Sequence, residues 1–289
     1  MTWKNLKNRL GHAGYVSSDE LSMAIYIALQ LERPILLEGD AGVGKTQVAK
    51  TIAEIEDTEL IRLQCYEGLD AAAAIYEWNY QRQLLSIRAS ADSGVSPDKI
   101  ENRIFSREFL LERPLLRAIQ QERPPVLLID EIDRADEEFE AFLLEILSDY
   151  QVSIPEIGTI EGKVKPIVFL TSNNTREIGD ALKRRCLHLY IPFPDAKLEE
   201  QIIASRVPDI EKNLKTELVN FVQNLRDLDL KKLPSVAETI DWAKSLVLLN
   251  VKSLDANLVR ETLNVLLKFQ SDIDAADSEI EAMIRKGNA

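Results

Sequence analysis

The chain has 289 residues, 45% of them hydrophobic, which suits one large domain or a medium domain followed by a small one. Its formal net charge of −13 argues against a sequence-tolerant nucleic-acid binder, because such proteins hold the phosphate backbone mainly through lysine and arginine. The sequence has neither an apolar run of about 18 residues nor an apolar N-terminal stretch, so we expect a cytoplasmic protein without a membrane span or signal peptide.

Strand-like and helix-like segments alternate between residues 34 and 192. Apolar, β-rich runs are expected at 34–38, 60–63, 126–130, 167–172 and 187–191. Helix-like segments are expected between them at 45–56, 70–88, 113–121, 137–150 and 178–184. This alternation predicts an α/β fold in which a parallel sheet is covered by helices on both faces.

Two stretches interrupt this alternation. Residues 151–165 alternate polar and apolar side chains around Gly158, which predicts a β-hairpin inserted before the fourth strand. Residues 86–103 are polar and include Gly94 and Pro97, so we expect a mobile loop there.

The C-terminal third of the chain is helical in character almost throughout. Ser235 followed by Glu238 has the spacing of a capping box at the start of a helix. We expect about four helices in this region. The chain is therefore divided into an α/β domain at 1–194 and a small all-helical domain at 195–289.

The cysteines and histidines limit the chemistry open to the chain. Cys65 and Cys186 each lie beside an apolar, strand-like run, which predicts two buried free thiols in place of a disulfide. His12 and His188 form no cluster with the cysteines, so the sequence predicts no zinc site.

A glycine-rich stretch follows the first expected strand and has the spacing of a phosphate-binding loop. It consists of Gly39, Asp40, Ala41, Gly42, Val43, Gly44, Lys45 and Thr46. The glycines let backbone N–H groups wrap a triphosphate at close range. We expect Lys45 to place its charge on the β- and γ-phosphates and Thr46 to give its hydroxyl to Mg²⁺. A strand before the loop and a helix after it make a chance match rare, so ATP and Mg²⁺ are the expected ligands.

The second half of the expected site ends a later apolar run. Four apolar residues, 126–129, precede Asp130 and Glu131. A buried strand of this kind delivers both carboxylates to the carboxyl edge of the sheet, where open α/β sheets bind ligands. We expect Asp130 to hold Mg²⁺ through its water shell and Glu131 to orient and deprotonate the attacking water. An acidic helix cap is the alternative interpretation, which the preceding phosphate loop disfavours.

With both motifs placed, the chain resembles the MoxR branch of the AAA+ ATPases, close to the CoxD-like subgroup associated with maturation of carbon monoxide dehydrogenase. The resemblance covers roughly residues 15–250. It is carried by the stretches LLEGDAGVGKT, LLIDEIDRAD, QVSIPEIG, FLTSNN, GDALKRRCLHLYIPFP and LPSVAETIDWAKSL. It implies a P-loop NTPase (AAA+) sheet domain followed by a helical lid domain.

The resemblance also implies roles for residues outside the two motifs. Asn173, at the end of the fourth expected strand, would help to position the attacking water; a strand-end turn is the alternative interpretation. Arg184 and Arg185 lie where family members offer an arginine finger to the γ-phosphate of the neighbouring subunit. The spacing favours Arg185 as the finger, and a solvated basic helix end is the alternative for both residues.

One departure from the family pattern concerns the helical domain. Many AAA+ proteins place an arginine at the start of the third lid helix, where it reaches the γ-phosphate of its own subunit. The matching stretch here is residues 235–238, and the equivalent position is Ala237. Hydrolysis would then depend more on residues from the neighbouring subunit.

The function expected from this resemblance is ATP hydrolysis by a ring that remodels a protein partner or assists metal-cofactor insertion. A finger used in trans requires a homo-oligomer, and the family mechanism implies a hexamer. The resemblance further implies a partner with a von Willebrand factor A domain, while the remodelled substrate stays open.

Two other functions are compatible with the same motifs. A DNA-processing motor is disfavoured by the acidic composition, since only Lys163 and Lys165 of the expected hairpin could line a positive pore. A nucleotide-binding switch or scaffold with slow hydrolysis is disfavoured by the intact Glu131. The residues that would read the base cannot be identified from the sequence, so a preference for GTP stays open as well.

Overall fold

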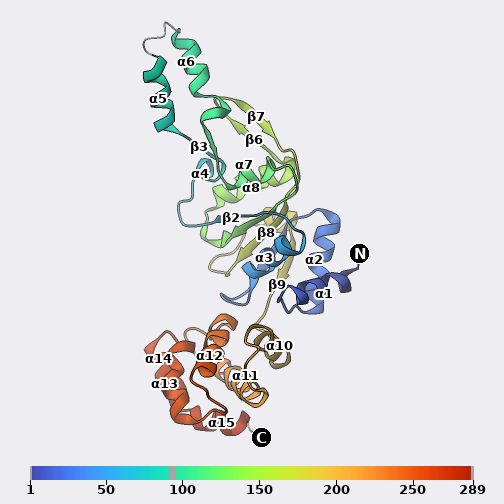
Figure 1. Ribbon diagram of the computed structural model, residues 1–289, viewed down its shortest axis with the longest axis vertical. Helices are drawn as coiled ribbons and strands as arrows, with labels where there is room; N and C mark the ends of the chain where they lie inside the picture. The colour runs from blue at the N-terminus through green and yellow to red at the C-terminus, as the bar shows by residue number, and fades with distance from the viewer. Residues whose placement is uncertain (1, 91–95, 288–289) are drawn as a thin grey trace. The chain divides into compact units, whose positions relative to one another are not determined.

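The computed structural model describes residues 2–90 and 96–287, which fall into two compact units. The sheet unit comprises residues 27–38 and 52–189, and the lid unit comprises residues 1–26, 39–51 and 190–289. Each unit has its own cluster of buried hydrophobic side chains. Figure 1 labels many of the helices and strands of both units.

Five parallel strands form the main sheet of the sheet unit. They are β1 (Ile35–Glu38), β2 (Leu60–Gln64), β5 (Val126–Asp130), β8 (Ile167–Ser172) and β9 (Leu187–Tyr190). Their order across the sheet is β2-β5-β8-β1-β9. The three central strands are buried almost throughout, whereas the edge strands β2 and β9 keep partly exposed side chains. The near-continuous apolar runs of the sequence are therefore explained by burial on both faces of a parallel sheet, as predicted.

The carboxyl ends of these strands meet at one edge of the sheet. Glu38 at the end of β1 is in register with Ser172 at the end of β8, and Gln64 of β2 is in register with Asp130 of β5. Because β8 lies between β5 and β1, the chain leaves these three strands at neighbouring positions. Open α/β sheets bind ligands at this edge, and the phosphate loop begins directly after Glu38.

Helices and short 3-10 turns flank the sheet. Those of the sheet unit outside the inserts are α4 (Ala71–Ile75), α7 (Pro114–Ile119), α8 (Glu137–Asp149), α9 (Asp180–Arg185) and η2 (Ile132–Arg134). Leu116 of α7 and Leu143 of α8 are fully buried in the core that also holds Leu127 and Leu170 of the strands. Two further helices, α2 (Asp19–Leu31) and α3 (Lys45–Ile55), contribute residues to both units. The predicted α/β class is confirmed.

The predicted hairpin before β8 is present. Strand β6 (Gln151–Ile154) pairs antiparallel with β7 (Gly158–Glu161), and Val152 faces Ile160 across the pair. Gly158 has φ +82°, a conformation that glycine adopts without strain. Val152 and Ile160 are buried, which anchors the hairpin to the core of the sheet unit.

A second insert corrects the prediction of one helix over residues 70–88. Helix α4 ends at Ile75, and the next residues form β3 (Tyr76–Trp78), which pairs antiparallel with β4 (Leu110–Glu112). The helix α5 (Tyr80–Ser90) begins only after this strand. The prediction failed because the partner of β3 lies far along the chain, so local sequence favours a continuous helix.

The predicted mobile loop at 86–103 is wrong at both of its ends. Its first residues belong to α5, and its last residues belong to α6 (Pro97–Ile104), which the turn η1 (Arg107–Phe109) follows. Pro97 occupies the first turn of α6, where the missing N–H costs no helical hydrogen bond, so it starts a helix here and does not break one. Residues 91–95, in the middle of the predicted loop, lie outside the described residues.

The lid unit contains the N-terminal helix and a helical C-terminal region. The helices are α1 (Trp3–His12), α10 (Ala196–Arg206), α11 (Lys212–Arg226), α12 (Val236–Leu248), α13 (Ala256–Leu266), α14 (Gln270–Asp277) and α15 (Ile280–Gly287). The region after residue 195 thus has six helices within its described part, where about four were predicted. Leu218, Trp242 and Leu263 are among the buried side chains that join α11, α12 and α13 in one core.

Caps and one buried ion pair fix the start of α12. The predicted capping box is confirmed: Glu238 donates its N–H to Ser235 Oγ at 3.3 Å, and Ser235 donates its N–H to Glu238 Oε2 at 2.7 Å. Arg226 pairs with Glu199 at 2.7 Å, and the two side chains are 6% and 0% exposed. The same guanidinium donates to the carbonyl oxygen of Pro234, which ties α10 and α11 to the residue before the cap.

Two further features bear on the sequence predictions, the cysteines and the length and apolar character of the helices. Cys65 and Cys186 are both buried and free, as predicted. Within the described residues, no helix has the length and apolar character needed to cross a membrane.

Candidate active site

The phosphate loop is packed so closely that two of its positions accept only glycine. Gly39 has φ +149°, and a Cβ there would lie 2.2 Å from the carbonyl oxygen of Ile191. Gly42 has φ +81°, and a Cβ there would lie 2.4 Å from the Cβ of Ser235, the N-cap of α12. Because these contacts are to backbone and to a buried cap, a larger residue would displace the loop. Within the lid unit, the loop is therefore in direct contact with the start of α12.

The loop gathers hydrogen-bond donors at the N-terminus of α3, which begins at Lys45. The Lys45 residue is buried, and its ammonium donates to the carbonyl oxygens of Gly39 at 2.6 Å and Asp40 at 2.7 Å. Among the described residues, no hydrogen bond is donated by the backbone N–H groups of residues 42–44. Such N–H groups at a helix N-terminus attract anions, so the loop offers the donors that a triphosphate needs.

Asp130, at the end of β5, is held by donors from both neighbouring strands. Thr171 of β8 donates its hydroxyl to Oδ1 at 2.5 Å, and Arg62 of β2 donates to Oδ2 from Nε at 3.0 Å. The Asp130 side chain is only 4% exposed, and Arg62 forms an ion pair with it. These contacts fix a carboxylate at the edge of the sheet, and oxygen ligands of this kind are the ones that Mg²⁺ prefers.

Glu131 follows in a left-handed conformation, with φ 57° and ψ 50°. Its N–H donates to Thr171 Oγ1 at 2.9 Å, so one hydroxyl accepts from Glu131 and donates to Asp130. The Glu131 carboxylate accepts from Gln64 Nε2 at 3.0 Å and lies 3.3 Å from a guanidinium nitrogen of Arg134. A left-handed backbone is uncommon outside glycine and is often found at functional turns.

The concentration of negative charge at this edge acts on a neighbouring thiol. Burial raises the pKa of Cys65 to about 12, and the charges of Asp130, Asp133 and Glu131 raise it as well. Cys65 also donates its N–H to the carbonyl oxygen of Asp130 at 2.9 Å, which places the thiol residue beside the acidic turn. A site that disfavours a further negative charge in this way favours a cation.

Asn173 is the first residue after β8 and is partly exposed. The described residues provide no hydrogen-bond partner for its side chain. The next residue, Asn174, has φ 58°, and its N–H donates to Ser172 Oγ at 3.1 Å. Because β8 lies between β5 and β1, Asn173 leaves the sheet between the strand that ends at Asp130 and the strand that leads to the phosphate loop.

Arg184 and Arg185 form the exposed C-terminal end of α9. Their backbone is held by Arg33, the residue before Pro34 at the start of β1. The Arg33 guanidinium donates to the carbonyl oxygen of Arg184 at 2.7 Å, to that of Arg185 at 3.1 Å, and to that of Cys186 at 3.3 Å. A cation at the C-terminal end of a helix satisfies carbonyls that have no helical partner. The two arginines therefore project from a helix end that is fixed to the sheet.

The start of α12 has no arginine to replace the one that the family pattern places there. Ala237 is the second residue of α12, and the helix contains no arginine at all. Arg226 lies close to the cap, but it is committed to Glu199 and to the carbonyl oxygen of Pro234.

Several contacts of the predicted residues could not be assigned from the sequence. The sheet edge brings Asp130, Glu131 and Asn173 together, whereas Arg184 and Arg185 lie apart from them on α9. The supporting residues that sequence reasoning missed are Arg33, Arg62, Gln64, Arg134 and Thr171. Some of them left a signal: Arg62 and Gln64 alternate on one side of an otherwise apolar strand, and Thr171 is a polar residue inside one.

Comparison with known proteins identifies related domains. Residues 34–186, more than half of the chain, match the AAA domain (dynein-related subfamily). An uncharacterised protein of Staphylococcus aureus is 24% identical over 205 residues, which cover 68% of this chain and 70% of that protein. Two solved variants of RuvB from Thermotoga maritima are similar in fold at 18% identity: one, with glycine for proline, has a TM-score of 0.51 and covers 92% of this chain and 71% of its own. The other, with serine for alanine, has a TM-score of 0.50 and covers 92% and 70%.

Proposed function

Because this chain belongs to the AAA domain family (dynein-related subfamily) and is an ATPase, we propose that it hydrolyses ATP in a ring of identical subunits to remodel a protein partner. The observation that carries the proposal is the construction of the sheet edge. Asp130 and Glu131 follow each other at the end of β5, the Thr171 hydroxyl bonds to both residues, and each carboxylate is held by its own donors. A metal-binding carboxylate and a catalytic base need fixed positions of this kind.

In the proposed reaction the loop residues bind the triphosphate. Backbone N–H groups of Gly39, Asp40, Ala41, Gly42, Val43 and Gly44 surround the phosphates, together with Lys45 and Thr46. The Lys45 ammonium balances charge on the β- and γ-phosphates, and donors at a helix N-terminus stabilise the same groups. Thr46 and Asp130 would hold Mg²⁺, whose role is to neutralise charge on the phosphate oxygens.

Glu131 orients and deprotonates the attacking water in this proposal, and Asn173 helps to position it. The carboxylate of Glu131 is partly exposed and is oriented by Gln64 and Arg134, so it is accessible and yet directed. A base must lie within hydrogen-bond reach of the proton that it takes, and supporting contacts of this kind keep it in place.

The ring assembly is supported by the arginines of α9. Arg184 and Arg185 are exposed, and the helix end that carries them is fixed by Arg33. We infer that one of them, with Arg185 favoured, reaches the γ-phosphate bound by a neighbouring subunit, which requires an oligomer; the family pattern makes it a hexamer. Position 237 is alanine, so the start of α12 supplies no arginine to the subunit's own γ-phosphate. In this proposal the arginine of the neighbouring subunit is therefore the main one that stabilises the transferred phosphoryl group.

The protein partner is proposed from the resemblance to the MoxR branch and its CoxD-like subgroup. On this basis the ring would be a chaperone-like, cytoplasmic assembly that acts with a von Willebrand factor A domain protein and assists insertion of a metal cofactor. We also propose that the chain has two domains, an α/β domain at 1–194 and a helical lid at 195–289.

A DNA-processing motor is the second candidate, because RuvB of Thermotoga maritima is described as a Holliday junction branch migration motor. The charges of this chain disfavour it. Lys163 and Lys165, the two lysines considered for a positive pore, follow β7 and are not at the turn of the hairpin, which contains Glu156. Lys165 also pairs with Glu32 at 3.3 Å. A nucleic-acid channel needs unpaired positive charge along its wall.

The test uses the Glu131→Gln protein, which should bind ATP without hydrolysing it. The loaded protein is sized by light scattering and presented in separate experiments with the von Willebrand factor A domain protein encoded nearby and with duplex DNA at low salt. We expect an ATP-dependent ring that retains the protein partner and not the duplex. Retention of duplex DNA with a steep salt dependence, and no retention of the protein, would replace the proposal with the motor.

A further inference from the structure

The insert between α4 and α7 forms a projection with its own supports. The antiparallel strands β3 and β4 carry the helices α5 and α6 away from the main sheet (Figure 1). Trp78 of β3 is buried and packs edge-to-face on Phe105, with ring centroids 5.3 Å apart. Gln83, also buried, donates from Nε2 to the carbonyl oxygen of Ile104 at 2.7 Å, which joins α5 to the end of α6. Buried contacts therefore join β3 and the two helices at the base of the projection.

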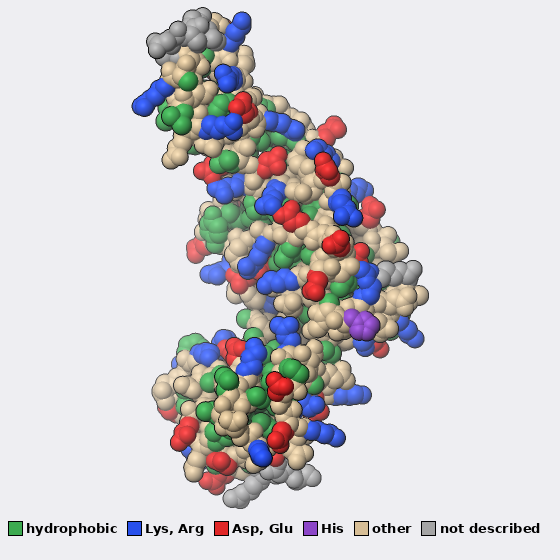
Figure 2. All heavy atoms as spheres, in the orientation of Figure 1, with side chains coloured by type: hydrophobic (Ala, Val, Ile, Leu, Met, Phe, Trp, Pro, Cys, Tyr) green, Lys and Arg blue, Asp and Glu red, His purple; other side chains and the backbone are tan. Residues whose placement is uncertain are grey.

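The exposed side of α5 is apolar and basic. Tyr80, Leu84, Leu85 and Ile87 are four of the 13 large hydrophobic side chains found exposed among the described residues, and all four lie in this helix of 11 residues. The helix contains arginines but no aspartate or glutamate, although the chain as a whole has a net charge of −13. In Figure 2 apolar and basic side chains lie close together at the insert, at the top of the view. Exposed apolar residues gathered in this way mark a binding surface.

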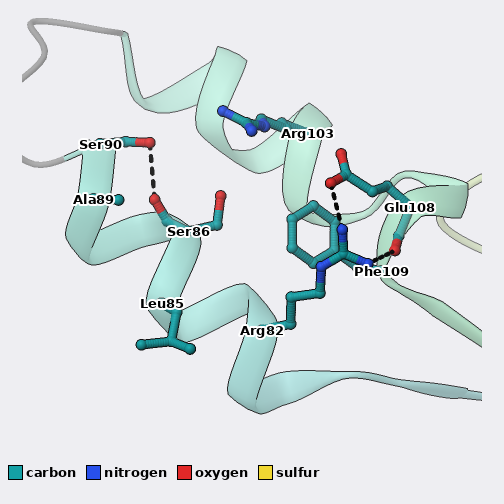
Figure 3. Close-up of a pocket in the computed structure, with 8 residues that line it drawn as sticks. All are labelled: Arg82, Leu85, Ser86, Ala89, Ser90, Arg103, Glu108 and Phe109. Atoms are coloured by element: carbon teal, nitrogen blue, oxygen red, sulfur yellow. Dashed lines mark hydrogen bonds and ion pairs between the residues drawn. The ribbon is translucent and has the colours of Figure 1, made fainter.

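A groove of about 550 Å³ lies between α5, α6 and η1 (Figure 3). Its floor is the ring of Phe109, which is buried, and its apolar wall is formed by Leu85 and Ala89 of α5. The volume is that of a site for a few side chains. A ligand that fills it must therefore present apolar groups to the floor and wall.

Two arginines stand at the rim of the groove. Arg82 is already bound: it donates from Nη2 to the Glu108 carboxylate at 2.7 Å, and its guanidinium lies 5.3 Å from the centre of the Phe109 ring. Arg103 of α6 is different, since none of the hydrogen bonds or ion pairs found among the described residues involves its side chain. Figure 3 shows Arg103 above the groove, on the side opposite Leu85. The rim thus carries the ion pair between Arg82 and Glu108, whose charges cancel, and the Arg103 guanidinium, which can bind a carboxylate.

We propose that this groove and the adjoining face of α5 bind a segment of a protein partner in which acidic side chains alternate with leucine-like ones. The apolar side chain enters between Leu85, Ala89 and Phe109, and an acidic neighbour pairs with Arg103. Electrostatic complementarity supports this occupant, because Arg103 is a cation that no carboxylate binds within the described residues, and α5 adds no aspartate or glutamate to the groove. The inference rests on the proposed function only in that it takes the partner to be a protein.

Nucleic acid is the less favoured occupant of the same surface. The Glu108 carboxylate stands at the rim beside Arg82 and would repel a phosphate chain, and the groove wall is formed by the aliphatic Leu85 and Ala89, on which bases cannot stack as they do on aromatic rings. A peptide with alternating acidic and apolar side chains suits this surface better, because its acidic side chain can pair with Arg103 while its apolar side chain contacts the groove wall.

The test measures fluorescence anisotropy of a labelled peptide that alternates leucine with glutamate, titrated with the full-length protein. The control peptide has lysine in place of each glutamate. We expect the acidic peptide to bind with a Kd on the order of 10–100 μM, as befits a small surface, and the basic peptide to bind at least about tenfold more weakly. Arg103→Glu and Leu85→Ser should each weaken binding of the acidic peptide about tenfold.

The matched control is Arg88→Glu, which reverses an exposed arginine of the same helix outside the groove. It should change the affinity less than about threefold, since its charge acts only through solvent. Equal binding of the two peptides, or an equal loss in Arg88→Glu and Arg103→Glu, would overturn the inference. So would binding of a duplex oligonucleotide that Arg103→Glu abolishes.

These results are separable from the proposed function. ATP turnover and ring assembly of the Arg103→Glu and Leu85→Ser variants should equal those of the wild type, which also shows that the variants fold. A failed peptide test with intact turnover and assembly overturns the docking surface alone. Loss of assembly or of partner retention in the Glu131→Gln experiment bears on the proposed function and not on the groove.

Discussion

The carboxylates at the sheet edge and the arginines at the end of α9 are held in opposite ways. Asp130 is nearly inaccessible and bonded through its side chain to Thr171 and Arg62. Arg184 and Arg185 are exposed, and what is fixed is their backbone, through Arg33. The proposed roles agree with this difference: a group proposed to act inside its own subunit can be oriented by side-chain contacts, whereas an arginine proposed to act on a neighbouring subunit needs an exposed side chain.

This difference predicts two classes of variant. Changes at the phosphate loop and the sheet edge should damage the subunit that carries them. Changes at α9 should leave that subunit able to bind ATP and should damage the site of its neighbour. The following experiments test the two classes, beginning with the largest expected effect.

Lys45→Ala tests the loop side of the comparison. The variant should lose measurable ATP binding, with a Kd raised at least about a hundredfold, because a buried ammonium no longer balances phosphate charge. Titration with a fluorescent ATP analogue measures the effect. Lys50→Ala, at an exposed lysine of the same helix, is the control and should bind normally. An affinity within about threefold of the wild type would remove the assignment of residues 39–46.

Glu131→Gln tests the sheet edge. ATP binding should persist and kcat should fall at least about a hundredfold, since the amide has nearly the same shape but cannot accept the proton. Steady-state ATP turnover is the measurement, with Glu138→Gln, an exposed residue of α8, as the matched control. A fall of kcat below about threefold would show that Glu131 is not the base.

Arg33→Gln tests the α9 side through the backbone of the helix end. The carbonyls of residues 184–186 lose their charged donor, so the finger should be misplaced while ATP affinity is unchanged. We expect kcat to fall about tenfold, because small displacements of a catalytic group cost this much or more. Arg123→Gln, another exposed arginine of the sheet unit, is the control. If Arg33→Gln instead raised KM and left kcat intact, Arg33 would not act through the finger.

The smallest expected effect concerns the two cysteines, which should not react with a thiol reagent while the protein is folded. Burial raises the pKa of Cys65 and of Cys186 to about 12. Both thiols are therefore protonated and covered at pH 8, and we expect reaction with a thiol reagent only after unfolding. The same shift stabilises the fold below pH 9, the ordinary value for the thiol, and this contribution is lost as the pH rises towards 12. Rapid labelling at pH 8 would contradict the burial.

The sequence predicts the central sheet well and the inserts poorly, for a physical reason. Strands β1, β5 and β8 are buried on both faces, so their apolar runs are continuous and easily found. Strand β3 has three residues, and its identity depends on pairing with residues 110–112, far along the chain. No local pattern contains that information.

The site shows the same division between local and distant information. The phosphate loop and the pair Asp130 and Glu131 are contiguous motifs, so their residue types and spacing alone predict phosphate and metal binding. The contacts that orient them, such as Arg62 with Asp130 and Arg33 with the end of α9, join residues more than sixty positions apart. They follow from the strand order and the packing of α9, which become visible only in the folded chain.

The most direct measurement is ATP turnover in mixtures of two defective variants, Arg185→Ala and Glu131→Gln. Each variant alone should bind ATP near normally and hydrolyse it poorly, with Arg185→Ala reduced by about a thousandfold if the arginine stabilises the transferred phosphoryl group. Light scattering first establishes that both variants assemble and exchange subunits.

Mixing should restore part of the activity, because some interfaces then join an intact Glu131 to an intact Arg185 from the neighbouring subunit. Two lesions within the same subunit's site could not complement each other in this way. The Arg184 and Arg185 double variant, mixed with Glu131→Gln, should behave as the single variant does. Turnover in the mixture that equals the sum of the separate variants, despite exchange of subunits, would contradict a finger that acts in trans and with it the ring mechanism.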